Sequence, residues 1–176
     1  MSKRIESETI GNALKLLTEN IGTAHAQTER LIIIGVADGG IEVARRLGHQ
    51  LSELWGRKVT VGFVNALFHR DDITERSIFK AYMRTDIPES VDDATVILVD
   101  DVLFSGRTIR AALNELFDNG RPKAVELAVL CDRGHRKLPV AANYTGMTLE
   151  TRRTEKVRVF LDEEAAQNDY LTVEEQ

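Results

Sequence analysis

Residues Val96–Thr108 read VILVDDVLFSGRT. Thr95–Val99 is an apolar run that is too short for a helix, as is typical of a buried parallel strand. Two adjacent carboxylates follow, and we expect Asp100–Thr108 to form a loop that leads into a helix over Ile109–Asn119. Gly120 ends that helix, as a glycine just past the last turn commonly does. The stretch therefore predicts one strand–loop–helix unit.

The chain alternates strand and helix on both sides of this unit. Apolar residues at helical spacing predict an amphipathic helix over Ser7–His25. The other expected elements are strands at Leu31–Ile34, Val59–Phe68 and Ala124–Cys131, an edge strand at Lys156–Leu161, a loop at Gly35–Gly40 and a helix at Ile41–Trp55. This alternation predicts an α/β fold of three layers, with a mostly parallel central sheet flanked by helices.

Size and composition favour one soluble domain over residues 1–176. The chain has 176 residues, of which 43% are hydrophobic and 29% charged, which is ordinary for a globular protein. It contains neither an apolar run long enough to span a bilayer nor the apolar stretch of a secretory signal. Cys131 has no second cysteine to pair with. We therefore expect a cytoplasmic protein.

The net charge of −5 gives no general positive field for nucleic acid. We expect the acidic end of the chain, Asp162–Gln176, to be solvated. His25 and His49 have no partner at a recognisable spacing and are expected on helix surfaces, whereas Cys131 is expected in the core.

The residues that follow the strand suit a phosphorylated sugar. Residues 105–108 (SGRT) offer backbone N–H groups, two hydroxyls and the positive end of a helix to a phosphate, and Gly106 lets the backbone approach closely. Asp100 and Asp101 can accept hydrogen bonds from vicinal sugar hydroxyls and help to hold Mg²⁺. Together these features describe a site for a phosphorylated ribose. The alternative is a solvated strand end followed by an ordinary helix N-cap.

This stretch closely resembles the phosphoribosyl pyrophosphate (PRPP) signature of type I phosphoribosyltransferases. Three further segments are similar to the PyrR family, whose members regulate pyrimidine-operon attenuation and are also uracil phosphoribosyltransferases. These segments are His69–Asp72 (HRDD), Thr85–Pro88 (TDIP) and Leu130–Pro139 (LCDRGHRKLP). With Lys156–Glu163 included, the similarity covers most of the chain from about residue 30.

The resemblance implies a type I phosphoribosyltransferase fold that converts uracil and PRPP into UMP and pyrophosphate with Mg²⁺. Asp100 and Asp101 would hold the ribose hydroxyls and, indirectly, the metal. The loop that binds PRPP and its phosphate would comprise Val102, Leu103, Phe104, Ser105, Gly106, Arg107 and Thr108. Arg70 would close over the pyrophosphate from a flexible hood at about residues 70–86, and Asp132 and Arg133 would lie beside the base.

The pyrophosphate loop departs from the family pattern. It comprises Ala37, Asp38, Gly39 and Gly40, where the family usually carries cations. A negative charge near the pyrophosphate is unfavourable by on the order of 1 kcal/mol. The backbone N–H groups of this loop can still form an anion-binding nest.

The family resemblance also implies a leader RNA of the pyrimidine operon as a partner. Family members that bind this RNA carry several arginines on the N-terminal helix, where this chain offers only Lys15. Because phosphate contacts dominate affinity for nucleic acid, we expect weak RNA binding. The candidate substitute patch consists of His135, Arg136, Arg152 and Arg153.

Phe104 bears on the choice of base. Hypoxanthine-guanine enzymes carry an aspartate at this position, whereas phenylalanine has no proton to exchange, which argues against a purine. Two alternatives stay open: a nucleotide-sensing RNA regulator with little catalysis, and a phosphoribosyltransferase for hypoxanthine, guanine or orotate. The resemblance further implies a homodimer or a higher homo-oligomer.

Overall fold

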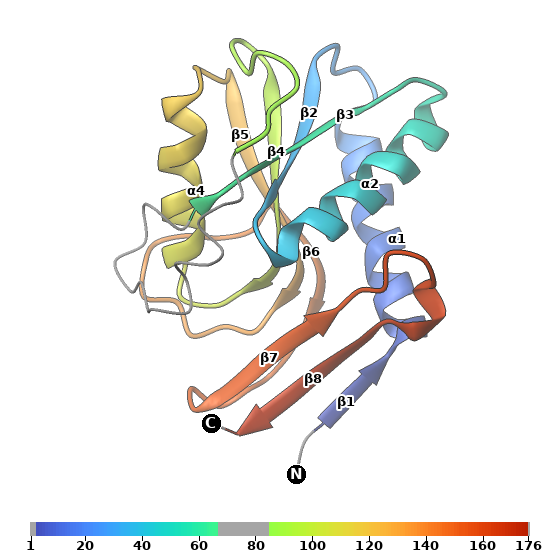
Figure 1. The fold of residues 1–176 in the computed structure, drawn as a ribbon, viewed down its shortest axis with the longest axis vertical. Helices are drawn as coiled ribbons and strands as arrows, with labels where there is room; N and C mark the ends of the chain where they lie inside the picture. Colours follow the sequence, from blue (N-terminus) through green and yellow to red (C-terminus); the bar gives the residue numbers. More distant parts are fainter. Residues whose placement is uncertain (1–2, 67–84, 176) are drawn as a thin grey trace.

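The structure is a computed structural model that describes residues 3–66 and 85–175. Its central sheet is fully parallel, with the strand order β3-β2-β4-β5-β6 (Figure 1). These strands are β2 (Leu31–Val36), β3 (Thr60–Val64), β4 (Thr95–Leu103), β5 (Ala124–Asp132) and β6 (Tyr144–Thr148). Helices α1 (Ser7–Ala24) and α2 (Gly39–Trp55) cover one face, and α4 (Arg107–Asp118) covers the other. The predicted three-layer fold is confirmed.

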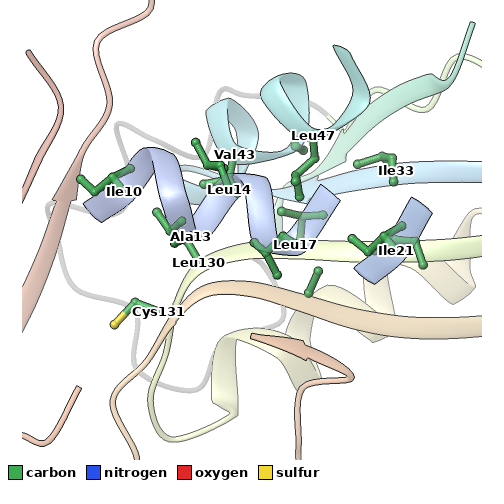
Figure 2. Close-up of a cluster of buried hydrophobic side chains, with 14 of the residues drawn as sticks. Ile10, Ala13, Leu14, Leu17, Ile21, Ile33, Val43, Leu47, Leu130 and Cys131 are labelled. Atoms are coloured by element: carbon green, nitrogen blue, oxygen red, sulfur yellow. The ribbon is translucent and has the colours of Figure 1, made fainter. Parts of the chain in front are cut away.

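The two faces of the sheet bury alternate residues of the same strands. Ile33 on β2 packs with α1 and α2, whereas its neighbours Ile32 and Ile34 pack on the side of α4. Figure 2 shows the apolar stripe of α1, from Ile10 to Ile21, facing α2 and the sheet. All six residues of β2 are buried, as expected for a parallel strand covered on both faces.

A second, antiparallel sheet lies beyond the carboxyl ends of the central strands (Figure 1). Its strand order is β1-β8-β7, formed by β1 (Lys3–Glu6), β8 (Tyr170–Glu175) and β7 (Glu155–Phe160), with a short 3₁₀ helix, η3 (Ala166–Asn168), before β8. The prediction of a solvated acidic end at Asp162–Gln176 is therefore wrong for its last strand. Leu171 and Val173 of β8 are buried in the same core as α1 and α2.

Several element boundaries differ from the predictions. β4 continues four residues past Val99 to Leu103, because it stays paired with β5 up to the Leu103–Asp132 pair. The predicted loop at Asp100–Thr108 is therefore confined to residues 104–106. The predicted loop at Gly35–Gly40 likewise shrinks to residues 37–38, because β2 runs to Val36 and α2 begins at Gly39.

The strand expected at Val59–Phe68 is observed at Thr60–Val64. Most of the hood expected at about residues 70–86, including Arg70, lies outside the described residues. Thr85 and Asp86 are described, and Asp86 forms an antiparallel bridge with Phe63. None of the described helices is both long and apolar enough to cross a membrane.

The two histidines assigned to helix surfaces behave differently. His49 is exposed, as predicted. The prediction for His25 is wrong, because its ring is buried at the end of α1, where Nδ1 lies 3.1 Å from the Thr28 hydroxyl and Nε2 lies 3.0 Å from the Glu126 carboxylate. Cys131 is fully buried in β5, as predicted, and burial raises the pKa of its thiol to about 12.

Candidate functional site

The two glycine-containing loops meet at the carboxyl ends of β2 and β4. A Cβ atom added to Gly39 would lie only 2.1 Å from Oδ2 of Asp101, and one added to Gly40 would lie 2.3 Å from the carbonyl oxygen of Val99. The N-terminus of α2 is therefore in direct contact with the acidic end of β4, which only a residue without a side chain permits. Parallel strands bring their carboxyl ends to one edge of a sheet, which is where ligands of such folds bind.

A hollow of about 160 Å³ lies where β4 turns into α4. It is lined by residues 102–109 together with Asp100 and Lys137. Gly106 caps α4 with a φ of 88°, a left-handed conformation that glycine adopts without strain. The start of a helix presents N–H groups and a positive dipole end, so the hollow suits an anion such as phosphate. The structure thus brings together all seven residues predicted for the PRPP loop.

The carbonyl groups of this loop are held by the segment that follows β5. The N–H of Arg133 donates to the carbonyl of Leu103 at 3.1 Å. The N–H groups of Lys137 and Leu138 both donate to the carbonyl of Ser105, at 3.0 and 3.1 Å. In a planar trans peptide the N–H points opposite to the C=O. The N–H that follows the Ser105 carbonyl, that of Gly106, therefore points away from this segment.

Asp100 and Asp101 lie in the last part of β4, and Asp100 is buried. An oxygen of Asp100 accepts a hydrogen bond from the N–H of Asp101 at 2.9 Å, and an oxygen of Asp101 accepts one from the N–H of Val102 at 2.7 Å. Burial raises the pKa of Asp101, and the nearby negative charge of Asp38 raises it further, although hydrogen bonds oppose both effects. Asp100 thus lines the phosphate-sized hollow, whereas the Asp101 carboxylate lies against Gly39 at the start of α2.

The side chains of Asp132 and Arg133, predicted to lie beside the base, form hydrogen bonds and a ring contact with other residues of the protein. The Asp132 carboxylate accepts a hydrogen bond from the N–H of Gly134 at 2.8 Å. The Arg133 guanidinium lies 4.3 Å from the centroid of the Phe104 ring and donates to the Arg152 carbonyl at 2.8 Å. Arg133 is only 5% exposed, and burial lowers its pKa. Its side chain therefore holds Phe104 in place.

Of the four residues predicted as an RNA-binding patch, two are partly buried and two are exposed. The His135 ring donates to the carbonyl of Thr151 at 2.6 Å, and Arg136 is hydrogen-bonded within the site. Arg152 and Arg153 are exposed, and Arg152 pairs with Glu175 at 3.2 Å. The exposed part of the patch is thus reduced to two arginines.

Lys137 was not singled out from the sequence, although it lines the hollow. The available signal was its place within the segment LCDRGHRKLP. Nothing in those letters shows that the segment folds back over the loop between β4 and α4, so the lysine could not be assigned to the phosphate side.

Comparison with known proteins identifies the family. Residues 5–164 match the phosphoribosyl transferase domain family. The chain is 45% identical over 158 residues to the bifunctional protein PyrR of Corynebacterium glutamicum, covering 89% of this chain and 82% of that protein. It is 38% identical over 173 residues to the bifunctional protein PyrR of Bacillus subtilis, covering 97% of this chain and 95% of that protein. The chain belongs to the PyrR family of phosphoribosyltransferases.

Solved structures agree on the fold. The hypoxanthine phosphoribosyltransferase of Trypanosoma cruzi superimposes with a TM-score of 0.68 over 97% of this chain and 95% of that protein, at 17% sequence identity. At this identity the likeness shows the fold alone. Membership of the PyrR family thus rests on sequence, and the type I phosphoribosyltransferase fold rests on both comparisons.

Proposed function

We propose that this chain transfers ribose 5-phosphate from PRPP to uracil, giving UMP and pyrophosphate. The observation that carries the proposal is the hollow between β4 and α4, which Asp100 lines together with a loop suited to an anion, with the Asp101 carboxylate at the start of α2 next to it in sequence. PRPP carries two vicinal hydroxyls, which the carboxylates can bind, and a 5-phosphate, which the loop can bind. We further propose that residues 1–176 act as one domain in the cytoplasm.

In this proposal the side chains bind and orient, and they take little part in covalent change. Asp100 and Asp101 accept hydrogen bonds from the ribose hydroxyls, and residues 105–108 hold the 5-phosphate with N–H groups and hydroxyls. The bond between C1 of the ribose and pyrophosphate breaks, a bond from C1 to N1 of uracil forms, and the N1 proton of uracil passes to the departing pyrophosphate or to water. The ribose gains positive charge in the transition state, so the aspartates stabilise it electrostatically.

Pyrophosphate is proposed to lie at the N-terminus of α2, beside Asp38 and the two following glycines. Mg²⁺ would supply positive charge to neutralise it there. The donor set fits this ion, because Mg²⁺ binds through one or two carboxylates together with substrate phosphates and keeps several waters. Among the described residues no cluster of three or more His, Cys, Asp or Glu side chains is arranged to hold a metal alone. The metal is thus expected to arrive with PRPP.

Phe104 supports a pyrimidine as the base. Its ring contacts the Arg133 guanidinium and makes a T-shaped contact with the His135 ring, whose centroid is 6.2 Å away. A phenyl ring held in this way offers no proton to a purine nitrogen. Uracil is therefore preferred over hypoxanthine and guanine, and orotate is the pyrimidine competitor.

A panel of labelled bases tests the proposal. The protein is incubated with PRPP, Mg²⁺ and uracil, hypoxanthine, guanine or orotate, and nucleotide products are separated. We expect UMP from the wild type and from Glu174→Gln, a half-buried control on β8, and none from the Asp100→Asn/Asp101→Asn double variant. Failure of the wild type to make UMP would reject uracil as the substrate.

We also propose UMP-dependent binding of pyrimidine-operon leader RNA as a second function, supported by the exposed Arg152 and Arg153. A gel shift over a range of salt concentrations, with and without UMP, tests it. No shift at any salt concentration would exclude this role.

Self-association is proposed as well, because Leu16 on α1 is 43% exposed and Leu54 on α2 is 57% exposed. Sedimentation of the wild type and of Leu54→Glu measures it.

A further inference from the structure

We propose that Arg136 is a positioning residue that holds the phosphate-binding loop in its active shape. The inference rests on the proposed function, because it assumes that this loop binds the 5-phosphate of PRPP. It assigns Arg136 to the PRPP site, whereas the sequence pattern had placed it in a patch for RNA. The assignment comes from the contacts of the Arg136 guanidinium alone.

All three nitrogens of this guanidinium donate to acceptors within the protein. Nη1 donates to the carbonyl of Phe104 at 2.7 Å and also lies 3.3 Å from the carbonyl of Leu103. Nε donates to the carbonyl of Val140 at 3.1 Å, and Nη2 pairs with the carboxylate of Asp132. One side chain thus joins the end of β4, the phosphate loop and both ends of the segment after β5.

The contact with the Phe104 carbonyl sets the direction of the loop. A carbonyl oxygen carries partial negative charge and would repel a phosphate if it faced the hollow. Arg136 holds this oxygen on the opposite side. Because C=O and N–H point in opposite directions across a trans peptide, the N–H of Ser105 is turned away from Arg136. The amides of Lys137 and Leu138 act in the same way on the next peptide, through the Ser105 carbonyl.

Arginine suits this role better than lysine. The guanidinium is planar and presents five donors in a fixed fork, so it can bind several carbonyls and a carboxylate at once. Asp132 fixes the orientation of the fork and balances its charge, and the Arg136 side chain is 22% exposed. A lysine ammonium is a compact charge on a flexible stem and cannot span the same acceptors. The role therefore requires the shape of the group as well as its charge.

The test compares Arg136→Ala, Arg136→Lys and Arg158→Ala with the wild type. Arg158 is a matched control, since it is an exposed arginine on β7 that pairs with Glu174. The dissociation constant of PRPP with Mg²⁺ is measured by calorimetry, with and without millimolar guanidinium chloride, and thermal unfolding is followed in parallel. We expect Arg136→Ala to weaken PRPP binding at least about tenfold, Arg136→Lys to recover only part of the loss, and Arg158→Ala to bind normally.

Added guanidinium should restore most of the affinity of Arg136→Ala, because it can occupy the vacated position, and should leave the wild type unchanged. Binding by Arg136→Ala within threefold of the wild type would overturn the inference, and so would a loss that guanidinium does not repair. If the wild type binds PRPP but makes no UMP, the proposed reaction fails while the effect of Arg136 on PRPP affinity still decides this inference. A wild type that binds no PRPP would refute both.

Discussion

Gly39 and Gly40 follow each other in the sequence, but a side chain at each position would meet a different obstacle. A Cβ at Gly40 would strike the backbone carbonyl of Val99, which β4 holds in the sheet. A Cβ at Gly39 would strike the carboxylate of Asp101, which can rotate away. Crowding at position 40 therefore acts on the fold, whereas crowding at position 39 acts on a residue of the proposed site.

We predict that Gly39→Ala lowers catalytic efficiency at least about tenfold, because Asp101 must leave the orientation set by the Val102 N–H. Gly11→Ala is the control, since a Cβ there meets nothing within 4 Å and alanine is the better helix former. It should keep full activity and gain about 0.5–1 kcal/mol in the free energy of unfolding. Steady-state kinetics and urea denaturation measure the two effects. Equal activities for the two variants would contradict the proposed role of Asp101.

The raised pKa of Asp101 predicts a pH dependence of PRPP binding. Its carboxylate accepts ribose hydrogen bonds most strongly when ionised, so affinity should fall as the pH falls through this raised pKa, above the ordinary value of about 3.9. Asp38→Asn removes a charge that raises the pKa, and should move the acid limb to lower pH. Calorimetry of both proteins with the same ligand cancels the titration of PRPP itself. An acid limb at the same pH in both would show that Asp38 does not act on Asp101.

Single residues with local signals could be predicted from the sequence, whereas residues with distant partners could not. Asp100 and Asp101 stand out because an apolar strand ends in two charges beside a glycine-containing loop. His25 gives no such signal, because its partners Glu126 and Tyr144 follow 101 and 119 residues later. The contacts of Arg136 could not be predicted for a related reason: a polar segment reads the same in the sequence whether its arginine binds carbonyls or faces solvent.

At the scale of elements, strands that depend on distant pairing were the ones the sequence misjudged. The three α-helices in the described part of the chain, α1, α2 and α4, were predicted, since a helix bonds within itself, whereas the short η3 was not. β4 extends past Val99 only because β5 continues to pair with it. The sequence predicts a solvated end over β8, because acidic surroundings hide the alternation of Leu171 and Val173. β8 pairs with β1 at the other end of the chain, a contact that no local pattern reveals.

The entry to β8 supplies a prediction about stability. Asp169 is 3% exposed and pairs with Arg46 of α2, with 2.5 Å between Nη1 and Oδ2. Asp169→Ala would leave Arg46 paired with Glu42 and would remove the acceptor of the Asp162 N–H, so we expect a loss of about 2–3 kcal/mol. Glu174→Ala breaks the solvent-accessible pair with Arg158 and a hydrogen bond from the Thr172 hydroxyl, and should cost only about 1 kcal/mol. Urea denaturation of both variants measures the difference, and equal losses would show that the small sheet is not anchored through Asp169.

At the scale of the molecule, one core joins the small sheet to the ligand-binding edge of the central sheet. Val157 of β7 and Leu171 of β8 share a cluster with α1, α2 and the buried residues of β4 and β5. A contact that stabilises the end of β4 should therefore raise the unfolding temperature of the whole chain. Ligand binding at that edge can be read from thermal unfolding without any assay of turnover.

We predict that PRPP raises the unfolding temperature much more when Mg²⁺ is present than when it is absent. At a concentration about 100 times its dissociation constant, a ligand raises the free energy of unfolding by about 2.7 kcal/mol. For a chain of this size, that corresponds to a rise of about 5–10 °C. Chelation with EDTA should remove most of the rise, because the described residues hold no metal cluster of their own and the pyrophosphate charge would face Asp38 unscreened. The Asp100→Asn/Asp101→Asn variant should show little rise under either condition, and an undiminished rise with EDTA would mean that PRPP binds without the metal.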